Sequence, residues 1–168
     1  DLRPRIYVYD PQFENPETLR MSVGYEREFF TDFSVGIDLI YSRSRHLQNK
    51  QDQNLVLTDE LTVDGRTVYQ WGTVYPELGQ VIMFNSKARA NARTLVLTAH
   101  KRLSNLWFLD ASYTWSNIRD NGTNFGASNY SYFPEDQFDI DADWGAADFD
   151  VRHKIVVSGG VYLPYDFM

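Results

Sequence analysis

Apolar and polar residues alternate along several stretches of the chain. At residues 107–116 the odd positions carry Trp, Leu, Ala, Tyr and Trp, whereas the even positions carry Phe, Asp, Ser, Thr and Ser. A period of two is that of a β-strand with one apolar and one polar face. The alternation recurs in four other stretches. It therefore predicts an all-β chain with five strands, near residues 18–29, 33–44, 93–103, 107–117 and 150–163.

Aromatic residues stand at both ends of the apolar faces. The strand that begins at Trp107 rises roughly 26 Å by Trp115, or roughly 19 Å along a membrane normal if it tilts by about 45°. Outer-membrane barrels present an apolar band of about 25 Å flanked by such rings, which favour the boundary between lipid and water. We therefore predict an antiparallel transmembrane β-barrel segment. Its lipid-facing aromatic girdle would be formed by Phe29, Phe33, Tyr41, Trp107, Tyr113 and Trp115.

The predicted connections alternate in length. Three-residue turns are expected at residues 30–32 and 104–106, and long loops at 46–92 and 117–149, the first with a small hairpin around Asp64 and Gly65. Bacterial barrels have short periplasmic turns and long extracellular loops. Arg27 and Lys101 precede the two turns, where a long side chain can snorkel to the interface. Five strands are too few to close such a barrel, so we expect a segment of a larger one.

The composition excludes several other classes of protein. Aromatic residues make up 15% of the 168 residues, mean hydropathy is -0.44, net charge is -7, and there is no cysteine. No run of about 18 apolar residues is present, which excludes a helical membrane span. Disulfides and thiolate chemistry are excluded too, and the acidic balance argues against a nucleic-acid partner. The first residues lack the features of a secretory signal. We predict no cofactor.

The polar faces of the predicted strands would line the barrel lumen. Because a barrel lumen is polar in any case, structural hydrogen bonding is a more common role for these side chains than substrate contact. The residues expected on this face are Asp38, Thr98, His100, Asp110, Ser112, Thr114, Arg152 and Lys154.

An acidic run in the second long loop is a weak candidate for a calcium site. Asp139, Asp141 and Asp143 alternate, and Asp150 follows eleven residues after the first, as in a calcium-binding loop. Trp144 stands where such a loop needs glycine. A run of acids is usually a solvated loop, and we favour that interpretation, with no metal bound.

Two further groups of residues were weighed for chemistry or binding. His153 lies near Asp150 and Arg152 in the sequence, but no serine-nucleophile motif or metal-spaced histidine pair accompanies it, so we predict no enzyme. Aromatic residues in the long loops either bind a ligand or partner or pack the loops together, and we favour packing. These residues are Tyr69, Trp71, Tyr75, Phe125, Tyr130, Tyr132 and Phe133.

Three separated stretches resemble the Oar-like TonB-dependent receptors. They are DPQFENPETLRMSVGYERE at 10–28, YTWSNIRDN at 113–121 and DIDADWGAADFDVRHKIVVSGGVYLPY at 139–165. The last contains that family's aspartate followed by Val-Arg-His and an apolar strand ending in Leu-Pro, here Asp150 to His153, Leu163 and Pro164.

The resemblance implies a 22-stranded barrel in the outer membrane of a Gram-negative bacterium, closed by a plug and coupled to TonB. The implied partners are outer-membrane lipid and lipopolysaccharide, the rest of the barrel and its plug, and TonB through an N-terminal part outside this chain. A surface lipoprotein or an extracellular ligand is a further candidate.

Two alternatives remain open at this point. One is a soluble β-sandwich or lectin-like module, in which Val35, Ile37, Leu109 and Ala111 would pack against a second sheet. The other is a small outer-membrane barrel enzyme, which needs carboxylate and imidazole groups converging near the outer rim.

Overall fold

The computed structural model describes two compact units. The described residues are 3–63, 65–72, 74–122 and 133–164. The first unit, called here the loop unit, comprises Asp1–Thr18, Ser44–Ala90 and Asp120–Gly145. The second, called here the sheet unit, comprises Leu19–Arg43, Asn91–Arg119 and Ala146–Met168.

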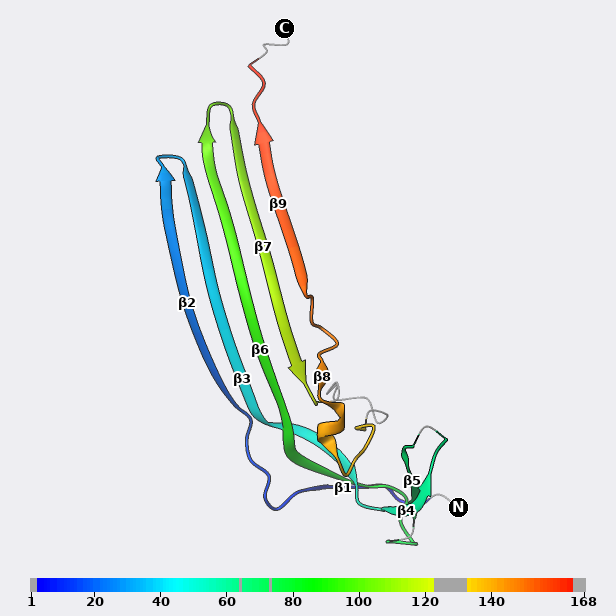
Figure 1. Cartoon of the computed structure of the whole chain (residues 1–168). Helices are drawn as coiled ribbons and strands as arrows, with labels where there is room; N and C mark the ends of the chain where they lie inside the picture. The colour runs from blue at the N-terminus through cyan, green and yellow to red at the C-terminus, as the bar shows by residue number, and fades with distance from the viewer. Residues whose placement is uncertain (1–2, 64, 73, 123–132, 165–168) are drawn as a thin grey trace. The chain divides into compact units, whose positions relative to one another are not determined.

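The sheet unit is made of five long strands, two of which, β3 and β6, continue beyond its limits (Figure 1). Strand β2 pairs with β3, β3 with β6, β6 with β7, and β7 with β9, and neighbouring strands run in opposite directions. The described residues contain one short 3-10 helix and no α-helix, so the predicted all-β antiparallel fold is confirmed. Among these residues, no helix has the length and hydropathy that crossing a membrane requires. The strands are β2 (Glu17–Phe30), β3 (Phe33–Asp52), β6 (Val81–Ser104), β7 (Trp107–Asp120) and β9 (His153–Val161).

The register of β7 and β9 keeps apolar residues on one face. Trp107 pairs with Val161 and Tyr113 with Ile155, whereas Asp110 pairs with a serine, Ser158. Because successive side chains point to opposite faces, this register gives the sheet one apolar and one polar face. The buried apolar residues among those described are Val81, Ile82, Ala88 and Ala147. None belongs to the apolar face of the sheet unit.

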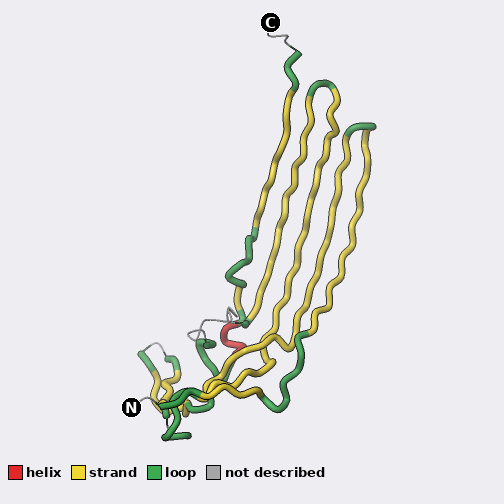
Figure 2. Tube along the Cα trace, turned by 180° about the vertical axis from the view of Figure 1, so that it is seen from behind, coloured by secondary structure: helices red, strands yellow, loops and turns green. Residues whose placement is uncertain are grey.

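The tight turns contain two residues, not the three predicted. Thr31 and Asp32 join β2 to β3, and Asn105 and Leu106 join β6 to β7. Both turns lie at the same end of the sheet unit (Figure 2). Asn105 and Leu106 have φ of 51° and 70°. Two positive φ values are typical of the hairpin turn whose twist matches that of the flanking strands.

The sequence predicted one long loop at residues 46–92, but the structure has strands over much of this range. Strand β3 continues to Asp52, β6 begins at Val81, and between them lies a hairpin of β4 (Leu55–Leu61) and β5 (Thr67–Trp71), which confirms the small hairpin. The end of β3 was missed because it buries polar residues, Asn49, Gln51 and Asp52, and the start of β6 because its apolar residues are consecutive, so neither alternates. Asn54 is fully buried, and its Nδ2 donates to the Gly79 carbonyl at 2.6 Å.

The second predicted loop and the last strand also have different limits. Strand β7 extends to Asp120, and residues 133–149 include the 3-10 helix η1 (Ile140–Asp143) and the short β8 (Gly145–Ala146). Strand β9 begins at His153 rather than at residue 150. The preceding residues make single contacts instead of a ladder, such as the Ser116 amide with the Arg152 carbonyl at 3.1 Å.

A parallel strand at the start of the chain completes the loop unit. Strand β1 (Ile6–Tyr9) pairs with the first residues of β6, Ile6 opposite Val81 and Tyr9 opposite Phe84. The Tyr9 ring lies 5.2 Å from the Phe84 ring, centroid to centroid. Aromatic contacts of this kind stabilise a pairing of only four residues.

Candidate functional site

The apolar face of the sheet unit is the first part of the candidate site, because its side chains are uncovered. Ile155 is 72% exposed and Val157 is 63% exposed, yet both lie in the middle of a strand. Val35, Leu109 and Ala111 are half-buried and Ile37 is exposed, so none is enclosed as a sandwich core requires. Within the described residues, therefore, no second sheet covers this face, which contradicts the β-sandwich alternative.

Four of the six predicted girdle residues, Tyr41, Trp107, Tyr113 and Trp115, lie on this apolar face. Trp107, Tyr113 and Trp115 share the β7 face that pairs with Val161, Ile155 and His153 of β9. Leu39, Tyr41 and Trp115 line one common groove there. His153 adds another ring to this face, stacked on Tyr113 with the ring centroids 6.1 Å apart. Their role as an interface girdle stays a prediction.

The opposite face carries ion pairs and hydrogen bonds between different strands of the sheet. His100 of β6 pairs with Asp110 of β7, and both were predicted on this face. Ser34 Oγ donates to Glu26 at 3.1 Å, and Arg102 pairs with Glu28. A hollow of about 400 Å³ lies among these groups, lined by Glu26, Glu28, Asp32, Phe33, Ser34, His100 and Arg102.

Other residues predicted to face the lumen occupy compatible positions. Thr114 pairs with Lys154 and Ser112 with Val156 in the β7–β9 register. A Cβ added at Gly24 would meet Asp38 Oδ1 at 2.2 Å, so the absence of a side chain on β2 makes room for that carboxylate. Arg152 differs, because it precedes β9 and pairs with Asp150 at 2.9 Å. The predicted lumen set omitted Glu26, Glu28 and Arg102, although alternation along β2 and β6 placed them on the polar side.

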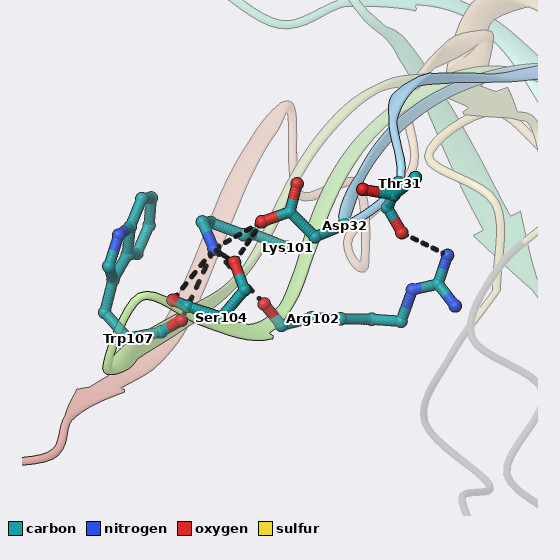
Figure 3. Close-up of polar contacts among 6 residues, drawn as sticks. All are labelled: Thr31, Asp32, Lys101, Arg102, Ser104 and Trp107. Atoms are coloured by element: carbon teal, nitrogen blue, oxygen red, sulfur yellow. Dashed lines mark hydrogen bonds and ion pairs between the residues drawn. The ribbon is translucent and has the colours of Figure 1, made fainter.

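A buried lysine joins the two tight turns (Figure 3). Lys101 Nζ lies 2.9 Å from Asp32 Oδ2 and 4.3 Å from the centroid of the Trp107 ring. It also donates to Ser104 and to the Trp107 carbonyl. Lys101 is 7% exposed, so it does not snorkel as predicted. Its equivalent, Arg27, lies over the Phe29 ring at 5.3 Å.

Asp32 is held in its charged form by this cluster. Ser104 donates a hydrogen bond to its carboxylate and Lys101 supplies a second, and these contacts hold the pKa of Asp32 below its ordinary value. Because Asp32 belongs to one hairpin turn and Lys101 adjoins the other, the cluster fixes the ends of two hairpins to each other. Figure 3 also shows Arg102 reaching the Thr31 carbonyl, at 2.8 Å.

Asp150 is bound to a neighbouring arginine and to β7 rather than to His153. Its side chain is 4% exposed and accepts from Ser116 Oγ at 3.0 Å and the Ile118 amide at 3.2 Å. Burial raises the pKa of Asp150, but these hydrogen bonds and that of Arg152 outweigh it, so the pKa is lowered. His153 Nδ1 instead lies 2.8 Å from the Tyr113 hydroxyl. The acid–base pair considered from the sequence is therefore not assembled.

The calcium candidates are each engaged by different protein groups. Asp139 accepts the Asp141 amide and begins η1, and Asp143 accepts the Glu135 amide at 3.1 Å. Asp141 pairs with Arg89 at 3.1 Å. Among the residues that the structure describes, no three or more Asp, Glu, His or Cys side chains form a group able to hold a metal ion.

Among the loop aromatics, the Tyr69 ring packs within the loop unit. The Tyr69 ring stacks on Phe138 with centroids 5.6 Å apart, and its hydroxyl donates to Asp136. Burial and the contact with Asp136 raise the pKa of Tyr69 to about 12. The Tyr75 amide donates to Asn54 at 2.8 Å. Phe125, Tyr130 and Tyr132 lie outside the described residues.

Comparison with known proteins agrees with this two-faced sheet. A family model described as an outer membrane beta barrel domain matches residues 2–167. Neither a curated protein nor a solved structure matches the chain.

Proposed function

The chain belongs to the outer membrane beta barrel domain family, and on this basis we propose that it forms part of the wall of a TonB-dependent receptor of the Oar-like type. The protein is located in the outer membrane. In this role the wall encloses a lumen through which a substrate passes with energy from TonB, or it carries loops that recognise a substrate at the cell surface. The observation that carries the proposal is the sheet unit, with one exposed apolar face and one ion-paired polar face.

The edges of the sheet support a larger barrel. In the part of the chain that is described, β2 pairs only with β3, and β9 pairs only with β7. An unpaired strand edge in hydrocarbon leaves backbone groups without partners at several kcal/mol each. Further strands on both sides remove that cost, and a 22-stranded wall supplies them.

The two faces support separate sets of partners. The apolar face would contact outer-membrane lipid and lipopolysaccharide, whereas the polar face with His100 and Asp110 would contact a plug. TonB would act through an N-terminal part, and a surface lipoprotein or extracellular ligand would bind at the long loops.

Cysteine labelling in living cells tests the proposal. Ser112→Cys places a thiol on the polar face of β7, and Ala111→Cys places its matched control on the apolar face. We expect a water-soluble maleimide to label only Cys at 112, and to label it more slowly when a protonophore removes the energy that TonB transmits. Equal labelling at both sites would contradict a barrel wall with one face in lipid and the other in water. A rate at 112 unaffected by the protonophore and by loss of TonB would contradict the energy coupling.

A further inference from the structure

An open groove of about 410 Å³ runs across four strands on the apolar face of the sheet unit, β2, β3, β6 and β7. Its apolar walls are Met21 and Val23 of β2, Leu39 of β3 and Leu95 of β6. The volume lies within the roughly 300–1,000 Å³ typical of sites for small organic ligands. Because this face is turned to lipid in an outer-membrane barrel, the nearest apolar material is an acyl chain.

One end of the groove is polar and cationic. Arg93 lines the same groove and is exposed, with Tyr41 and Trp115 beside it as further lining residues. The side chain of Arg93 has no hydrogen bond, ion pair or ring contact with the described residues. A guanidinium on a lipid-facing surface is costly unless an anion or water reaches it.

The position of Arg93 along the strands indicates that the anion belongs to a lipid headgroup. Arg93 and Tyr41 lie far from the tight turns at Thr31–Asp32 and Asn105–Leu106, and short turns are periplasmic in bacterial barrels. The arginine therefore lies toward the extracellular side, at the level where Tyr and Trp rings meet headgroups. Arginine binds phosphate through two parallel hydrogen bonds.

We propose that this groove binds a phosphorylated acyl lipid of the outer membrane. Its phosphate pairs with Arg93, and one acyl chain lies along Leu39 and Leu95. Tyr41 and Trp115 border the headgroup. The proposal rests on the location of the protein in the outer membrane and needs no energy-coupled passage. The result of the labelling at residue 112 therefore does not decide it.

Native mass spectrometry of the protein purified from its own membrane tests the proposal. The probes are a diphosphorylated lipid A and the same lipid without its phosphates. We expect Arg93→Gln to weaken binding of the phosphorylated probe about tenfold, the value of one charge-assisted hydrogen bond. Arg93→Lys keeps the charge and should retain most of the affinity. Arg20→Gln is the matched control, because Arg20 is also exposed and precedes Met21 on the other face of β2.

A second variant tests the acyl part of the site. Leu95→Trp fills the groove without changing its charge. It should weaken binding of the phosphorylated probe and leave the heat-modifiable gel shift of the folded barrel unchanged. Equal affinity of the wild-type protein and Arg93→Gln would overturn the proposal. So would equal binding of the two probes, or a loss with Arg20→Gln as large as that with Arg93→Gln.

Discussion

The two faces of the sheet unit hold hollows of nearly equal volume and opposite chemistry. The groove on the apolar face has about 410 Å³ and the hollow on the polar face about 400 Å³. On the polar face, Arg102 pairs with Glu28 and His100 with Asp110. On the apolar face, the side chain of Arg93 has no partner among the described residues. The charges of these two pairs on the polar face are therefore satisfied within the protein, whereas the charge of Arg93 depends on the surrounding medium.

The difference follows from a step of one residue along the same strands. Met21, Leu39 and Leu95 line the groove, whereas even-numbered residues such as Glu26, Glu28 and His100 line the hollow. Since successive side chains alternate, a single strand sequence specifies both surfaces at once, and a shift of register by one residue would exchange them.

The largest effect is expected from a charge placed on the apolar face. Val157→Arg puts a guanidinium opposite Ala111, near the middle of the paired strands. We expect it to lower the free energy of unfolding by about 2–4 kcal/mol, the cost of arginine at the bilayer midplane. Ser158→Arg, on the other face, is the matched control and should cost about 1 kcal/mol or less. Urea unfolding in lipid vesicles measures both, and equal losses would contradict the distinction between the faces.

The next effect concerns an aromatic ring on the polar face. Phe108 pairs with Gly160, and a Cβ added there would lie 2.6 Å from Phe108 Cε1. Gly160→Ala should therefore cost about 1–3 kcal/mol through overpacking. In a Phe108→Leu background the same substitution should cost less, and a double-mutant cycle by urea unfolding measures the difference. An unchanged cost would show that the ring does not cover the glycine.

A smaller effect, of opposite sign, is expected at the turn that sets the register of β6 and β7. Leu106 has φ of 70°, a backbone region that costs a residue with a Cβ about 1 kcal/mol. Leu106→Gly should raise the free energy of unfolding by up to about that amount, because relief of the Cβ contact outweighs the entropy that glycine adds to the unfolded chain. Asn105→Gly should raise the free energy of unfolding by less, because asparagine tolerates positive φ. A loss of stability in Leu106→Gly would contradict the account.

The smallest effect is a pH dependence at the turn cluster. The pKa of Asp32 is lower in the folded protein than its ordinary value of 3.8. Its contribution to stability is therefore complete above that value and is lost as the pH falls through the lower folded-state pKa. Asp32→Asn should differ from the wild type in urea midpoint at about pH 6 and converge with it toward about pH 2. A difference that stays constant with pH would contradict this role for Asp32.

The sequence predicted the membrane-facing part of the fold well, for a physical reason. In strands such as 107–117, lipid on one side and water on the other impose the alternation that was used to find them. The extension of β3 to Asp52 is largely polar on both sides, and β6 begins with four consecutive apolar residues, Val81 to Phe84, so neither segment shows that alternation.

The contacts of individual side chains could be predicted only in part. Alternation correctly placed His100, Asp110 and Thr114 on the polar face, because every second side chain of a strand points to the same face. The pairing of Lys101 with Asp32 did not, because it joins residues from two hairpins through the geometry of their turns. The grouping of Arg93 with Leu39 and Leu95 likewise depends on how β3 and β6 align.

The most direct test of the two-faced sheet is a spin-label scan of β7 in lipid vesicles. Each of residues 109–114 is replaced in turn by Cys, labelled, and its collision rates with oxygen and with a water-soluble nickel chelate are measured. We predict that the rates alternate with a period of two, oxygen favoured at Leu109, Ala111 and Tyr113 and the chelate at Asp110, Ser112 and Thr114. Uniform rates along the strand, or chelate contact at the odd positions, would contradict a wall with one face in lipid.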